Sequence, residues 1–199
     1  LLAVAAFALP LASSAASGIQ VFSNCQFVPA HWADGDSFPV RLPDGREVTV
    51  RLYGVDCIET SAANETLARR LRAQRRYFGI GGVEGIDSGE VARLFGVEAA
   101  KRTEVLLTEA FSVETSFTDA RGSGVSKRVY GFVTLSDGRD LGSVLVGEGV
   151  ARAFGVVRGR ADGTTGEEYR QHLVDLELVA AASGRGIWAR TDWSKLASD

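Results

Sequence analysis

Up to about residue 60, hydrophobic and polar positions alternate along the chain in short segments. The clearest is 47–55, in which Val48 and Val50 share one face and polar residues the other. Two similar segments precede it, at 26–30 and 38–42, and turn-forming residues separate the three. The pattern predicts a meander of three strands joined by tight turns.

Beyond residue 60 the hydrophobic positions recur every three or four residues, as in helices. Gly96 predicts a break in one of these helices, and Gly149 is the expected end of another. Two strand-like segments lie among them, so the chain predicts an α+β domain built on a mostly antiparallel barrel. The helix-like segments are 65–77, 90–110, 141–148 and 167–183, and the strand-like ones are 111–117 and 128–135.

An uncharged apolar run opens the chain, from Leu1 to Ala12, and small residues follow it. This composition is typical of a secretory signal peptide, here trimmed at its start because it has neither Met nor a basic region. The run is shorter than the about 20 residues of a spanning helix, and Pro10 disfavours a buried helix. We expect a signal peptide over 1–18, a single domain over 19–199, and a secreted or periplasmic protein.

The composition suits one globular domain, with 45% hydrophobic and 24% charged residues among 199. The formal net charge is −3 and the sequence pI is about 5.5. Such an acidic protein would meet nucleic acid through a local basic patch, or as an enzyme that binds transiently. Two cysteines, Cys25 and Cys57, are consistent with a disulfide in an oxidising compartment or with two buried free thiols.

Candidate chemistry gathers in the meander and just after it. Asp36 follows a glycine turn and Asp56 ends a strand, so both can offer oxygen ligands to a hard cation such as calcium. Arg51 lies close to them in sequence and can bind a phosphate through two parallel hydrogen bonds. Glu59 can reach a water near the cation. Taken alone, these residues are more typical of a turn and a surface arginine.

The order of motifs along the whole chain resembles that of the staphylococcal nuclease (thermonuclease) family. That family has Asp-Gly-Asp before a hairpin, then Arg-Leu-x-x-x-Asp, then Glu-Thr. It also has an arginine opening a strand that leads to an Asp-Gly turn, then Glu-Gly-x-Ala, His-Leu and Gly-Ile-Trp. The resemblance is collinear from about residue 26 to 190. The matching positions are 34–36, 51–56, 59–60, Arg128, 137–138, 148–151, 172–173 and 186–188.

The resemblance implies a five-stranded barrel of the oligonucleotide-binding type with about three helices. It also implies a calcium-dependent endonuclease that uses one calcium ion and acts on DNA, with RNA as a further candidate. Water would attack the phosphorus, releasing a 5′-hydroxyl and leaving a 3′-phosphate. The implied catalytic residues are the general base Glu59 and the phosphate ligands Arg51 and Arg128, and the implied calcium ligands are Asp36, Asp56 and the backbone carbonyl of Cys57.

Two departures from the family pattern concern substrate binding. The family has Tyr-Gly before its second arginine, whereas this chain has Ser-Lys, which makes Lys127 an alternative phosphate ligand. Two tyrosines that stack on the nucleotide in the family fall near Gly155 and Val157 here. The candidates to replace them in binding substrate are Arg152, Arg158 and Phe154.

The segment 61–90 is longer than its counterpart in the family and predicts an inserted helix. A solvated helix face is the usual role of such a run of charges. The alternative is a lid that contacts phosphates, whose binding would weaken steeply with salt. The arginines of this helix are Arg69, Arg70, Arg72, Arg75 and Arg76.

Two other functions stay open on the sequence. Barrels of this type also occur as non-catalytic binding modules, which the acidic pI and the missing tyrosines favour. A phosphodiesterase for a small exported phosphoester is the second. The complete catalytic set favours the nuclease. His31 and His172 fit no recognised metal motif, and we expect a monomer with no stable protein partner and no membrane association.

Overall fold

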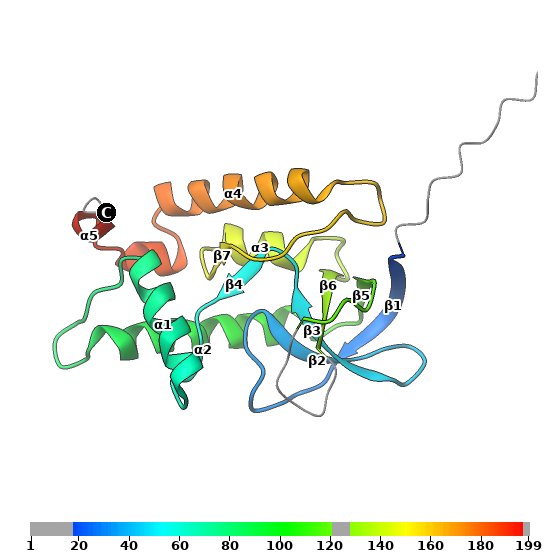
Figure 1. Ribbon diagram of the computed structural model, residues 1–199, viewed down its shortest axis with the longest axis horizontal. Coiled ribbons are helices and arrows are strands. Elements are labelled where there is room, and N and C mark those ends of the chain that lie inside the picture. The colour runs from blue at the N-terminus through cyan, green and yellow to red at the C-terminus, as the bar shows by residue number, and fades with distance from the viewer. Residues whose placement is uncertain (1–17, 121–127, 197–199) are drawn as a thin grey trace, which may run out of the picture.

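Five strands close into a barrel in the computed structural model, which describes residues 18–120 and 128–196. Around the barrel the order is β1, β2, β3, β6, β5 (Figure 1). All neighbouring pairs are antiparallel except β3 and β6, which run parallel. The predicted α+β fold with a mostly antiparallel barrel is therefore confirmed. The strands are β1 Gln20–Phe27, β2 Ser37–Arg41, β3 Glu47–Leu52, β5 Phe111–Thr115 and β6 Arg128–Thr134.

A turn at Tyr53-Gly54 ends β3 before residue 55, where the alternating pattern had predicted its end. Gly54 has a φ of 68°, and a Cβ there would lie 2.9 Å from side-chain carbons of Leu173 and Val157. After the turn, β4 (Val55–Cys57) pairs with β7 (Ala151–Ala153) instead of a barrel strand. Because of this change of partner, β4 is not one of the barrel strands.

The helices occur where the spacing of hydrophobic residues predicted them. Gly149 and Gly184 follow α3 and α4 with φ of 74° and 59°, as expected of residues just past a helix end. The chain also forms two short helices near its end that the sequence analysis did not anticipate. The elements are α1 Glu65–Tyr77, α2 Ser88–Leu106, α3 Leu141–Gly147, α4 Gly166–Ala182, the 3-10 helix η1 Gly186–Arg190 and α5 Trp193–Leu196.

The predicted break at Gly96 is wrong, since α2 passes through this residue without interruption. A Cβ at Gly96 would lie 2.5 Å from the carbonyl oxygen of Ile58 and 2.7 Å from that of Glu59. The glycine therefore lets α2 approach the backbone that follows β4. Its role is close packing, which a sequence cannot distinguish from helix breaking.

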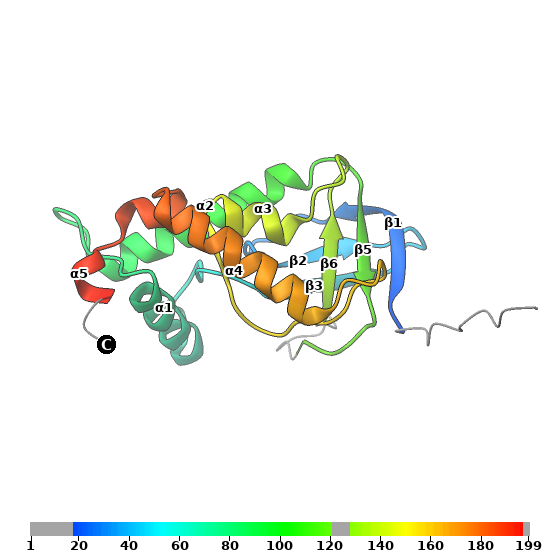
Figure 2. The same cartoon turned by 90° about the horizontal axis from the view of Figure 1, so that it is seen from above.

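The barrel lies at one end of the molecule, and α1 and α5 lie at the other (Figures 1 and 2). The barrel core includes Val50, Val113 and Phe132, and α3 and α4 pack on each other beside it. A second, smaller core joins α1, α2, α4 and η1 through side chains such as Leu71 and Trp188. This second core fixes α1 in place.

Cys25 and Cys57 are free, buried thiols in the barrel core. Of the two possibilities that the sequence left open, the structure thus has the unpaired one. Burial raises the pKa of Cys25 to about 11, which keeps this thiol protonated and unreactive near neutral pH. In the described part of the chain, no helix has the length and apolar character needed to cross a membrane.

We expect Gly96→Ala to lower the free energy of unfolding by about 1–3 kcal/mol, because the added methyl group meets backbone oxygens that cannot rotate away. Urea unfolding followed by circular dichroism measures the change. Gly147→Ala is the matched control, since a Cβ there has only an ordinary contact, 3.7 Å from Leu176. Equal stability of the two variants would show that α2 does not depend on this close approach.

Candidate active site

Four short segments bring the predicted catalytic and metal-binding residues together. Arg51 lies near the end of β3, Asp56 and Cys57 on β4, and Glu59 just after β4. Asp36 lies directly before β2, whose first residue, Ser37, pairs with Arg51 in the β2–β3 register. The turn at Gly54 is what lets β3 and β4 present side chains to one another.

The guanidinium of Arg51 lies between two buried carboxylates. Its Nη1 forms an ion pair with Asp36 Oδ1, and its Nη2 donates to Asp56 Oδ1 at 3.0 Å. Asp36 and Asp56 are only 1% and 3% exposed. Burial opposes the charge on Arg51, but the attraction of Asp36 and Asp56 is stronger and raises the pKa of Arg51 above its ordinary value. A buried carboxylate pair of this kind requires such a partner.

Asp36 also connects the first turn to β4. Its Oδ2 accepts a hydrogen bond from the backbone N–H of Cys57 at 2.6 Å. Asp34 has a local role, since its Oδ1 accepts from the backbone N–H of Ser37 at 2.7 Å and so closes the turn. Burial raises the pKa of Asp36 well above its ordinary value, although Arg51 opposes the shift.

Asp56 accepts hydrogen bonds from three elements besides its own. In addition to Arg51, Gln74 Nε2 donates to its Oδ2 at 3.0 Å, and Arg152 Nε donates to the same oxygen at 2.9 Å. Burial alone would raise the pKa of Asp56, but Arg51 and Arg152 outweigh it and lower that pKa below its ordinary value. Asp56 therefore stays ionised.

Glu59 is 5% exposed, and burial raises its pKa above the ordinary value even though Arg70 opposes the shift. Its Oε1 lies 2.7 Å from Arg70 Nη2, yet this oxygen accepts no hydrogen bond of good geometry. Its backbone N–H donates to Gln74 Oε1 at 2.9 Å. The backbone of Glu59 is thus held firmly, while its carboxylate keeps capacity to accept a proton.

Two residues of α1, Arg70 and Gln74, belong to the site but were not singled out as site residues from the sequence. Gln74 is 1% exposed and bridges Asp56, the carbonyl oxygen of Cys57 and the N–H of Glu59. Their spacing of four residues places both on one helix face. This spacing is the sequence signal that could have indicated both as site residues. Nothing in the sequence shows which face of α1 turns toward β4.

A pocket of about 520 Å³ opens over these residues and is lined mostly by basic and aromatic side chains. Arg128, at the start of β6, lines it and donates from Nη2 to the carbonyl oxygen of Ala120 at 2.8 Å. Lys127 lies outside the described residues. The pocket is lined by Arg51, Arg69, Arg70, Arg128 and Arg152, with Asp56, Gln74, Tyr130, Phe154 and neighbouring small residues.

Arg152 and Phe154, two of the candidates for substrate binding, occupy one wall of this pocket. Arg152 is 9% exposed. Its guanidinium pairs with Asp56 and lies 4.3 Å from the ring centroid of Phe154. Phe154 is 55% exposed. The main contact of Arg152 is therefore its ion pair with Asp56, and Phe154 is the residue of the two that is accessible to a ligand.

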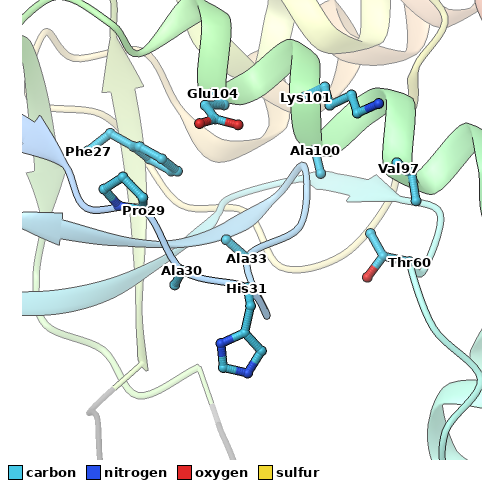
Figure 3. A pocket seen from close by; sticks show the side chains of 10 residues that line it. All are labelled: Phe27, Pro29, Ala30, His31, Ala33, Thr60, Val97, Ala100, Lys101 and Glu104. Atoms are coloured by element: carbon cyan, nitrogen blue, oxygen red, sulfur yellow. The ribbon is translucent and has the colours of Figure 1, made fainter.

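A second pocket, of about 420 Å³, lies between the loop after β1 and α2 (Figure 3). Its lining is mostly apolar, with His31, Lys101 and Glu104 as its charged or titratable members. It is lined by no arginine and by one carboxylate, so it lacks the pair of carboxylates and the arginines predicted for the active site. His172 lies elsewhere, on α4, where Nε2 is 3.2 Å from Ser143 Oγ.

The donor chemistry of Asp36, Asp56 and Cys57 fits a hard cation. The groups are adjacent, because Cys57 N–H binds Asp36 and Gln74 bridges Asp56 and the Cys57 carbonyl. Calcium takes carboxylate and carbonyl oxygens of this kind. In residues 18–120 and 128–196 no three acidic, histidine or cysteine side chains converge as a ready-made metal cluster. A cation here would therefore need the carbonyl oxygen and water as ligands, beside two carboxylates that already share Arg51 as a partner.

We expect Gln74→Leu to lower the free energy of unfolding by about 1–3 kcal/mol for each buried group that loses its only partner, foremost the N–H of Glu59. Urea unfolding measures the loss. Gln171→Leu is the control, because this glutamine is exposed and bonds Asp175 within α4, and a change within about 0.5 kcal/mol is expected. Equal effects would mean that Gln74 does not support the site.

Comparison with known families agrees with this geometry. A family model described as staphylococcal nuclease homologue matches residues 49–190, which include Arg51, Asp56, Glu59 and Arg128. A comparison with curated protein sequences finds no significant match. The matched region covers well over half of the chain and contains most of the barrel and the helices that follow it. By this match, the chain belongs to the staphylococcal nuclease family.

Proposed function

We propose that the protein is an exported, calcium-dependent nuclease that hydrolyses phosphodiester bonds of DNA, with RNA as a further substrate. The observation that carries the proposal is the arginine-lined pocket that contains Asp56, together with Arg70, which lines it and lies 2.7 Å from Glu59. Membership of the family supports a nuclease-type or nucleic-acid-binding domain. Cleavage, calcium and export go beyond that and rest on the residues themselves.

Arg51 and Arg128 both line the pocket and would bind the non-bridging oxygens of one phosphate. Negative charge grows on these oxygens as the five-coordinate transition state forms, and guanidinium groups directed at them would stabilise it. Arg51 now donates to Asp36 and Asp56. Binding a phosphate would require it to exchange part of these contacts.

Glu59 suits the role of general base. Its raised pKa brings it closer to neutral pH, where a carboxylate takes a proton from water more readily than one of ordinary pKa. The water oxygen would bond to phosphorus while its proton passes to a Glu59 carboxylate oxygen, and the P–O5′ bond would break. The departing 5′-oxygen would take a proton from solvent water and leave as a 5′-hydroxyl. Asp36, Asp56 and the Cys57 carbonyl would hold calcium, which supplies Lewis-acid polarisation of the phosphate when bound.

The remaining parts of the proposal rest on separate features. Export rests on the apolar run at 1–12 and the small residues after it, which lie outside the described residues. Nucleotide binding rests on Phe154, whose exposed ring can stack on a base although no tyrosine stands at Gly155 or Val157. The acidic pI of about 5.5 favours the alternative, a binding module without catalysis.

Incubation of the purified chain with single- and double-stranded DNA tests the proposal, with calcium and then with excess chelator. Calcium-dependent degradation that the chelator stops is expected. Binding without cleavage under all conditions would favour the binding module instead. Cleavage of a small phosphodiester but of no DNA would point to the small phosphoester.

We expect Glu59→Gln to reduce turnover at least about a hundredfold, because the amide cannot accept the proton of the attacking water. Single-turnover cleavage of a labelled oligonucleotide measures this. Glu98→Gln is the matched control, an exposed glutamate on α2, and should cleave at the wild-type rate. Near-normal turnover of Glu59→Gln, with the fold intact by circular dichroism, would remove Glu59 from the role of base.

A further inference from the structure

One face of the inserted helix α1 forms a wall of the arginine-lined pocket. Arg69, Arg70, Ala73 and Gln74 line it, two pairs of residues spaced four apart. Arg72 and Arg76 are exposed and do not line it. The arginines of α1 therefore do not form one uniform solvated surface. Arg69 and Arg70 line the pocket, whereas Arg72 and Arg76 are exposed to solvent away from it.

The remainder of α1 holds this face in a fixed orientation. The side chain of Asn64 caps the first turn by accepting from Leu67 N–H at 3.0 Å. Leu71 is buried in the second core, and Arg75 donates to Ser88 Oγ at the start of α2. The pocket wall is thus a preformed surface, and a ligand that uses it need not first order the helix.

Arg69 and Arg70 differ in their partners. Arg70 lies 2.7 Å from Glu59 Oε1 and 3.5 Å from Asp56 Oδ1, so carboxylates already neutralise it. Arg69 is exposed and forms no ion pair with the described residues. Asp56 is the only carboxylate among the described residues that line the pocket, against five arginines. The rim at Arg69 therefore carries positive charge without a carboxylate partner in that part of the chain.

We propose that Arg69 forms a second phosphate subsite, which binds the backbone phosphate next to the one held by Arg51 and Arg128. The inference rests on the proposed function and specifies its substrate. The preferred ligand is then a single-stranded chain with at least two adjacent phosphates, and an ester with a single phosphate uses only part of the site. Phe154, on the same pocket, is available to stack on a base of that chain.

Binding of fluorescent single-stranded DNA tests the subsite, measured by anisotropy with calcium present. All proteins carry Glu59→Gln so that the DNA stays intact. Against this background, Arg69→Gln should weaken binding of a dodecamer about tenfold, the loss of one charge-assisted contact. It should also reduce the slope of log K against log salt by about 0.7, the value for one phosphate on a single strand.

Arg72→Gln is the matched control, because it removes the same charge from the same helix away from the pocket. It should leave the slope unchanged. A dinucleoside monophosphate, which has a single phosphate, should bind Arg69→Gln and the background protein equally. If Arg69→Gln and Arg72→Gln weaken the dodecamer equally, or if the monophosphate loses as much affinity as the dodecamer, the subsite is overturned. If the wild type neither binds nor cleaves any DNA, the proposed function fails together with it.

Discussion

The contact of Arg51 with Asp36 and Asp56 is the interaction on which the rest of the site depends. Two carboxylates, 1% and 3% exposed, can be buried this deeply only if positive charge and hydrogen-bond donors surround them. Arg51 supplies both from the end of β3. The turn at Gly54 brings β4 back toward the end of β3, which places Asp56 beside Arg51. The backbone conformation at Gly54 therefore determines that these two charges meet.

The need to satisfy these carboxylates extends to parts of the chain far from the barrel. Asp56 accepts hydrogen bonds from Gln74 of α1 and Arg152 of β7, and Asp36 accepts one from the backbone N–H of Cys57. Arg152 is held in this way, which is why it contributes to the pocket mainly as the partner of Asp56. The protein carries a net charge of −3, yet five arginines line one pocket, and three of them, Arg51, Arg70 and Arg152, pair with Asp56.

The local pattern of hydrophobic residues and glycines predicted the features that depend on neighbours in the sequence, such as helix bounds and helix ends. The bounds of α1 at 65–77 agreed with its spacing of leucines, and the glycines after α3 and α4 took the left-handed conformation expected of them. Gly96 shows the limit of prediction from local sequence. Its role depends on the carbonyl oxygens of Ile58 and Glu59, which only tertiary packing brings near. The pairing of Asp56 with Arg152, 96 residues apart, is equally invisible to periodicity.

Helix α1 illustrates how a helix outside the barrel can become part of the site. Gln74 satisfies the N–H of Glu59 and the carbonyl of Cys57, and Arg70 faces Glu59 and Asp56. Without α1, these buried groups would meet water or lack partners, which would change both the stability of the loop after β4 and the pKa of Glu59. The site therefore depends on α1 for these partners. Arg69 has no such role, because it lies at the rim, and this leaves it available to contact substrate.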